Sequence, residues 1–131
     1  MSEAVATLHA VVEGRAEAAA LAEWIAEDAV FHSPVMHTPQ HGKALVMQYL
    51  GAALQMFRQY DFRYVRQVLN DSDAVLEFAV EMDGIYVNGA DFLALDTDGK
   101  ITDFKVMIRP LKGLEKVRAK MLEQLAAADR V

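Results

Sequence analysis

Apolar residues recur at three- and four-residue spacing in four stretches of the chain, and this spacing places them on one face of an α-helix. The pattern predicts helices over residues 3–12, 15–26, 43–57 and 111–128. The second stretch is rich in alanine and would bury Leu21, Trp24 and Ile25. The third would carry Tyr49 and Phe57 on its apolar face.

Between residues 62 and 109 the pattern changes to runs rich in branched and aromatic residues, which are typical of β-strands. These runs cover residues 62–70, 74–82, 85–96 and 101–109, and the separators "DSD", "DG" and "TDGK" are hairpin-turn signals. A shorter strand, residues 29–33, stops at Pro34, and residues 35–41 are expected to be loop. The order predicts an α+β fold, with helices against one face of a curved antiparallel sheet.

Composition narrows the class of protein further. The 131 residues show no repeat or linker, so residues 1–131 are predicted to form a single domain. No apolar run reaches the roughly 20 residues of a membrane helix, and the N-terminus does not resemble a signal peptide. The net charge of −6 and the scattered basic residues argue against nucleic-acid binding, and the chain has no cysteine. We expect a cytoplasmic protein without a membrane partner.

One carboxylate interrupts an apolar row in the run 85–96. A regular strand would turn alternate residues onto one face: Ile85, Val87, Gly89, Asp91, Leu93 and Leu95. A buried carboxylate is costly, so Asp91 would be hydrogen-bonded, protonated or facing a cavity. The alternative is a bulge at Gly89 that turns Asp91 to solvent. We favour the cavity, because perturbed acids in clefts tend to mark functional sites.

Three of the four histidines fall within ten positions, at His32, His37 and His41. Two of them, His37 and His41, are four apart, but Pro39 lies between them in a predicted loop and no acid stands close in sequence. A metal generally needs three or four converging ligands. We therefore expect His37 and His41 at the mouth of a pocket, and we predict no metal and no cofactor.

Two interpretations of His32 stay open. Its unperturbed pKa suits acid–base chemistry near neutral pH, so it could assist catalysis. Strand alternation, however, places His32 on the face opposite Phe31 and Ser33. A structural histidine, hydrogen-bonded under a helix or at a dimer interface, fits the sequence equally well.

Several segments resemble the SnoaL-like branch of the nuclear-transport-factor-two-like superfamily. They are "LAEWIAEDAVFHSPV", "HGKALVMQYL" and the strand runs closed by "DTDGKITDFKVMIRPL", and they span nearly the whole chain. The resemblance implies a cone-shaped α+β barrel, with the curved sheet wrapped around the N-terminal helices, and homodimers that pair through the outer sheet face. The superfamily includes polyketide cyclases, ketosteroid isomerase, limonene epoxide hydrolase and non-enzymatic domains, so the fold alone does not define the function.

Ketosteroid isomerase offers the nearest correspondence at the site. That enzyme has an aspartic acid eight residues before the glycine of its last hairpin, and Asp91 stands eight before Gly99. The resemblance implies that Asp91 is kept neutral and donates a hydrogen bond to a developing oxyanion. The proton-abstracting aspartate of that enzyme falls on Ser33, and its first-helix tyrosine falls near Thr7. Since serine alone cannot shuttle a proton at neutral pH, these residues argue against that mechanism.

Limonene epoxide hydrolase is a poorer match, because its last-strand Trp-Arg-Asp is replaced by Phe104-Lys105-Val106, without the acid. We predict capture of a small hydrophobic, carbonyl-bearing molecule, with Asp91 as the anchor and His32 or Ser33 assisting any cyclase or isomerase chemistry. The side chains expected to line the apolar pocket are Phe31, Tyr49, Phe57 and Leu93, although core packing also explains Tyr49. The alternative is a non-catalytic ligand-binding or dimerisation module, whose cavity its own Met and Phe side chains would fill.

Overall fold

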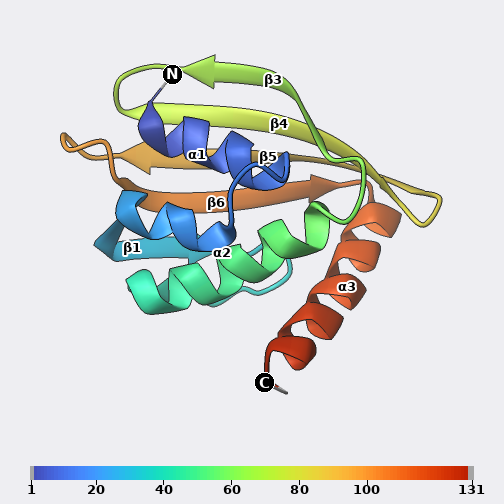
Figure 1. The fold of residues 1–131 in the computed structure, drawn as a ribbon. Helices are drawn as coiled ribbons and strands as arrows, with labels where there is room; N and C mark the ends of the chain where they lie inside the picture. Colours follow the sequence, from blue (N-terminus) through green and yellow to red (C-terminus); the bar gives the residue numbers. More distant parts are fainter. Residues whose placement is uncertain (1, 130–131) are drawn as a thin grey trace.

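A computed structural model describes residues 2–129 (Figure 1). The helices are α1 (Glu3–Val12), the 3-10 helix η1 (Ala18–Trp24), α2 (Lys43–Phe57) and α3 (Leu111–Asp129). The strands are β1 (Ile25–His32), β2 (Gln40–His41), β3 (Arg63–Leu69), β4 (Asp73–Met82), β5 (Ile85–Leu95) and β6 (Ile101–Arg109). None of the described helices is both long and apolar enough to cross a membrane.

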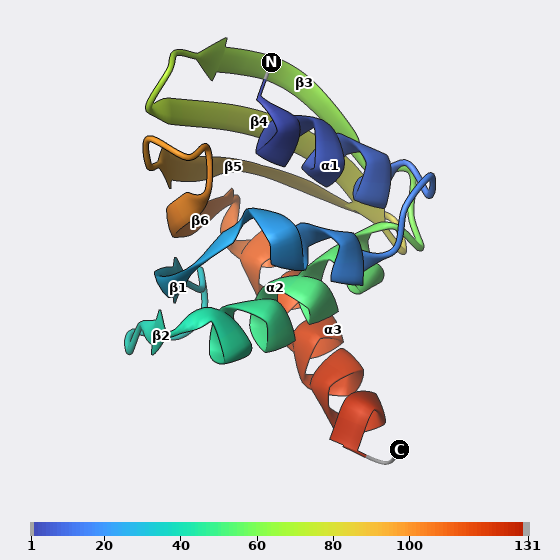
Figure 2. The ribbon, with the colours of Figure 1, turned by 60° about the vertical axis from the view of Figure 1, so that its left-hand side comes forward.

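The strands form a six-stranded sheet in the order β2-β1-β6-β5-β4-β3. Strands β3 to β6 make the predicted antiparallel meander. The sheet as a whole is mixed rather than antiparallel, because β1 lies parallel to β6. The predicted α+β class is confirmed: α1, η1 and α2 lie against the concave face of a curved sheet, and α3 lies beside α2 (Figure 2).

The prediction of a single α-helix over residues 15–26 is wrong. Only Ala18–Trp24 is helical, in the 3-10 form, and the following strand already begins at Ile25. Buried Ala18 and Leu21 are three residues apart, which suits the three-residue turn of a 3-10 helix. Pairing of Ile25 with Ile101 extends β1 well before residue 29, and local periodicity carries no signal for a partner so distant in sequence.

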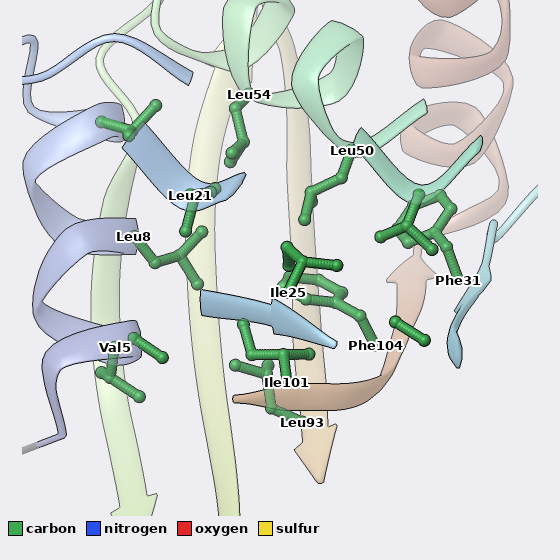
Figure 3. Packing of buried hydrophobic residues seen from close by; sticks show 14 of the residues in the cluster. Val5, Leu8, Leu21, Ile25, Phe31, Leu50, Leu54, Leu93, Ile101 and Phe104 are labelled. Carbon is green, nitrogen blue, oxygen red and sulfur yellow. The ribbon is translucent and has the colours of Figure 1, made fainter. Parts of the chain in front are cut away.

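The core lies between the helices and the concave face. Helix α1 is capped by Ser2, whose Oγ accepts a hydrogen bond from the amide of Val5 at 3.2 Å. Large apolar side chains from helices and strands meet in this space (Figure 3): Val5, Leu8, Leu21, Ile25, Phe31, Leu50, Leu54, Leu93, Ile101 and Phe104. The two buried rings of Phe31 and Phe104 have their centroids 5.8 Å apart.

A second cluster, built on phenylalanine rings, fills the space where the end of α2 meets β3 and β4. Phe62 stacks on Phe78 with centroids 4.9 Å apart, and Phe57 lies 5.1 Å from Phe62 and 5.3 Å from Phe78. Aromatic rings at these separations add favourable contacts beyond simple burial of area. The interior on either side of Asp91 is therefore densely packed with apolar groups.

Candidate functional site

The alternating row predicted for β5 is present. Leu76 pairs with Asp91 and Phe78 with Gly89 in an uninterrupted β4–β5 ladder, so the bulge considered at Gly89 does not occur. Val87, Gly89, Asp91, Leu93 and Leu95 are all buried. Asp91 keeps only 5% of its surface exposed, and its side chain points into the apolar interior.

Tyr64 on β3 is the protein partner of that carboxyl. Its hydroxyl donates a hydrogen bond to Oδ2 of Asp91 at 3.2 Å. The Tyr64 ring lies edge-on to Phe62, with centroids 5.1 Å apart, and 4.7 Å from the ring of His9 on α1. His9 is held in turn by Gln67, with Nε2 and Oε1 2.8 Å apart. Side chains from α1 and β3 thus fix Tyr64 over Asp91.

Sequence reasoning missed Tyr64, although a signal exists. Phe62 and Tyr64 alternate in the run 62–70, as residues on one strand face do. A register shift between Tyr64 and Arg66 then interrupts the alternation. The bulge brings Gln67 onto the same face as Tyr64, which is how Gln67 reaches His9.

Burial controls the protonation of the pair. Loss of hydration raises the pKa of Asp91 to about 7, although the hydrogen bond from Tyr64 acts in the opposite direction. Burial, followed by the negative charge of Asp91, raises the pKa of Tyr64 well above its usual value. Near neutral pH the Asp91 carboxyl is therefore protonated in a large share of molecules, and Tyr64 remains a hydrogen-bond donor.

The second oxygen of Asp91 has no partner among the side chains and backbone groups that the structure describes. Tyr64 is bonded to Oδ2, and no hydrogen bond to Oδ1 is found among the described residues. Every fully buried side-chain nitrogen or oxygen in that part of the chain has a partner. The small exposed area of Asp91 therefore includes Oδ1, which can meet a ligand or water.

A small apolar cavity lies on the same side of the sheet as Asp91, between the end of β1, α2, β6 and α3, and Asp91 is not among the residues that line it. Its volume is about 20 Å³, room for roughly one water. Val106 lines it and is the β6 residue that pairs with Asp91, so the cavity ends one strand away from the acid. Side chains of Phe31, Ser33 and Phe57 also line it. The structure thus brings three of the predicted site residues together.

The other predicted pocket residues lie in the packed core. Leu93 is buried two positions from Asp91 on the same strand face. Tyr49 is half-buried and packs against the main hydrophobic cluster. Neither is among the residues that line the cavity. Ser33 Oγ accepts a hydrogen bond from the Val35 amide at 3.2 Å, so its hydroxyl caps a turn at the cavity wall.

His32 lies on the opposite face of the sheet from Asp91. Phe31 is buried, whereas His32 turns outward and pairs with Asp103, with Nε2 and Oδ1 2.9 Å apart. The structure therefore does not bring His32 to Asp91, because strand alternation directs successive side chains to opposite faces.

The remaining histidines of the cluster, His37 and His41, are exposed. His41 lies in the two-residue strand β2 rather than in loop, and neither histidine lines the cavity. Within residues 2–129, no three His, Asp or Glu side chains are grouped closely enough to hold a metal.

Comparison with solved structures shows which known proteins the whole chain resembles. A steroid delta-isomerase from Pseudomonas aeruginosa is 32% identical, with a TM-score of 0.87 over 98% of this chain and 93% of that chain. An uncharacterized protein with a cystatin-like fold from Silicibacter pomeroyi is 27% identical, with a TM-score of 0.85 over 99% and 90%. The epoxide hydrolase/cyclase-like enzyme SalBIII, 22% identical with a TM-score of 0.63 over 82% and 88%, shares the fold.

The sequence profile of the SnoaL-like domain matches residues 4–104. The chain therefore belongs to the SnoaL-like domain family, and the resemblance found in the sequence is confirmed. No curated protein is similar enough to extend the comparison.

Proposed function

We propose that this protein binds a small, neutral, hydrophobic molecule through a carbonyl group, with Asp91 as the polar anchor. The observation that carries the proposal is a buried carboxyl with one oxygen bonded to Tyr64 and the other without a partner within residues 2–129. Similarity to a steroid delta-isomerase at 32% identity supports a ligand of this kind.

The charge of the site favours a neutral ligand. The cavity comes within one strand of Asp91, at Val106, and the described residues that line it are apolar apart from Ser33 and include no lysine or arginine. A carboxylate ligand would lose its hydration there without gaining a cation, and that loss costs several kcal/mol by order of magnitude. A ketone or aldehyde oxygen needs only a donor, and the protonated Asp91 carboxyl supplies one.

The chemistry that this arrangement supports is polarisation of the bound carbonyl. A neutral acid aimed at the oxygen stabilises negative charge that develops there, and Tyr64 on Oδ2 makes Asp91 the stronger donor. Ser33 at the cavity wall is not a base at neutral pH, and His32 faces the other side of the sheet. We therefore propose that the protein binds the ligand and polarises its carbonyl group. Any cyclase or isomerase turnover would then be limited to steps that need only the acid supplied by Asp91.

A ligand screen by thermal shift tests this proposal. At pH 6, ketones, steroids and polyketide-like aromatic ketones should raise the melting temperature by several degrees, since a ligand at 100 times its Kd stabilises by about 2.7 kcal/mol. Matched carboxylic acids should not. The double variant Tyr64→Phe/Asp91→Leu removes the pair without orphaning either polar group, and it should lose the shift.

Tyr86→Phe is the matched control, because it deletes an exposed tyrosine hydroxyl elsewhere in the chain. It should keep the full response to the ketones. A shift that survives in the double variant, or that carboxylates produce equally well, would contradict the role of Asp91.

A second proposal concerns the outer face of the sheet, where we propose that two copies of the chain pair. Val68, Phe92 and Met107 are exposed there by 62%, 38% and 55%, around a groove of about 420 Å³. Arg66 and Glu77 lie in the same groove and pair with each other, with Nε and Oε1 3.2 Å apart, so neither brings an unbalanced charge to the surface between two copies. Exposed apolar patches of this kind mark interaction surfaces.

Sedimentation velocity tests the pairing. Wild type should sediment as a dimer at tens of micromolar, and Met107→Glu should shift it toward monomer, because the charge must be buried at the interface. Leu111→Glu places the same charge on exposed Leu111 of α3, outside the groove, and should leave the dimer intact. A monomeric wild type would refute the pairing, whereas a dimer that binds no ketone would favour the dimerisation module.

A further inference from the structure

We propose that the C-terminal half of α3 is the movable wall through which a ligand reaches Asp91. This inference rests on the proposed function, because it explains how a cavity of about 20 Å³ could admit a molecule that needs a few hundred. Val117 and Met121 of α3 line the cavity opposite Val106. In both overall views α3 runs away from the sheet toward the C-terminus (Figures 1 and 2).

The first half of α3 is fixed to the sheet. Gly113 is buried so closely against β5 that a Cβ there would lie 3.0 Å from the carbonyl oxygen of Tyr86. Lys116 and Lys120 hold Asp83 in the β4–β5 turn, with their Nζ atoms 2.9 Å and 3.4 Å from Oδ2. These contacts make this half of the helix a fixed base about which the rest can swing.

Beyond Lys120 the attachment is much weaker. Leu122 is 59% exposed, and Met121 is only half-buried. Gln124 donates to Gln55 Oε1 of α2 at 3.2 Å and accepts from Gln59 at 3.4 Å. No inter-element ion pair is found in the described part of α3 beyond Lys120. Two exposed amide hydrogen bonds therefore provide most of the polar attachment there.

The other walls of the cavity are harder to move. Phe31 and Val106 belong to strands β1 and β6, which are hydrogen-bonded within the sheet. Helix α2 buries six side chains: Val46, Leu50, Ala52, Leu54, Met56 and Phe57. In α3, Val117 is the one side chain among residues 111–127 that is fully buried, at 2% exposed. Displacing the end of α3 exposes the least apolar surface, so it is the least costly route.

Thiol labelling measures this opening without any ligand, since the chain has no cysteine of its own. Val117→Cys places a reporter of similar size in the cavity wall, in the fixed half of α3 and one turn before Met121, so its thiol is uncovered when the movable half carries Met121 away. Arg118→Cys gives the rate for an exposed thiol on the same helix. The Val117→Cys thiol should react far more slowly than the Arg118→Cys thiol. Adding Gln124→Ala should accelerate it about fivefold, because both amide contacts are lost.

Gln48→Ala is the matched control, since Gln48 is exposed on α2 and its side chain makes no hydrogen bond with any residue that the structure describes. It should leave the rate unchanged. Low urea should also change the rate little, because local opening exposes much less surface than unfolding. A rate that is unaffected by Gln124→Ala, or that rises in low urea as steeply as global stability falls, would overturn the proposal.

A ketone that stabilises the protein should slow labelling of the Val117→Cys thiol, because bound ligand covers the reporter. If the Val117→Cys thiol is labelled through local opening but no ketone stabilises the protein, the proposed function is refuted and the movable wall is not. Ketone binding combined with labelling only through global unfolding would refute the movable wall and leave the proposed function standing.

Discussion

Asp91→Asn should be more stable than wild type above pH 7 and should lose that advantage in acid. The expected change in the free-energy difference between the two proteins is on the order of 4 kcal/mol from pH 4 to pH 8. The cause is the cost of ionising a carboxyl that is 5% exposed in an apolar core. Urea unfolding of both proteins at several pH values measures it.

The sign follows from the pKa in each state. An unfolded aspartate has a pKa of about 3.9, whereas burial raises the pKa of folded Asp91 to about 7. Between these values the folded state holds a proton that the unfolded state has released. The contribution of Asp91 to stability is therefore complete below pH 4 and declines by about 1.4 kcal/mol per pH unit until pH 7.

Comparison with Asp91→Asn is needed because other acids titrate in the opposite sense. Hydrogen bonding by Arg15 and Lys116 lowers the pKa of Glu13 and Asp83 respectively, so acid weakens those exposed contacts. Both acids are present in the two proteins, and their contribution cancels in the difference. A difference that stays constant from pH 4 to pH 8 would mean that Asp91 titrates as an ordinary exposed aspartate.

Gly89→Ala should destabilise the protein by about 3 kcal/mol, the upper end for overpacking a core. A Cβ at Gly89 would lie 2.4 Å from Cζ of Phe78 and 2.6 Å from the carbonyl oxygen of Met107. Phe78 is buried against Phe57 and Phe62, and the Met107 oxygen belongs to the sheet backbone, so neither can move aside. Chemical unfolding measures the loss.

Gly51→Ala makes the same chemical change with the opposite expected result. Gly51 lies inside α2, and a Cβ there would meet only the Cβ of Ala18, at 3.9 Å. Replacing a helix-interior glycine should stabilise by about 0.5–1 kcal/mol. Equal effects at Gly51 and Gly89 would show that the row leading to Asp91 is not packed as described.

The strands around the site could be predicted because their signals are local. Alternation in residues 85–95 placed Asp91 in an apolar row, and that row is present. The "DG" separator forms the two-residue β4–β5 turn, in which Asp83 and Gly84 both take positive φ, as such turns require. The four strands of the meander and the turns between them could be predicted from local signals of this kind.

The features that escaped prediction depend on partners far away in sequence. Tyr64 and Asp91 are 27 positions apart, and His32 and Asp103 are 71 apart. The parallel pairing of β1 with β6 also has no local signal, and it converts the expected helix end at Ile25 into strand. Cavity size depends on how Met56, Met121 and their neighbours pack, which a one-dimensional pattern does not encode.

Carbon-13 NMR of the aspartate side chains tests the central claim most directly. Titration should reveal one carboxyl with a pKa of about 7, absent from Asp91→Asn. Adding the ketone that gives the largest thermal shift should raise that pKa further, because the protonated form donates to the carbonyl and ligand and proton then bind cooperatively. A pKa for Asp91 near 4, or one that the ketone lowers or leaves unchanged, would contradict its role as a neutral anchor.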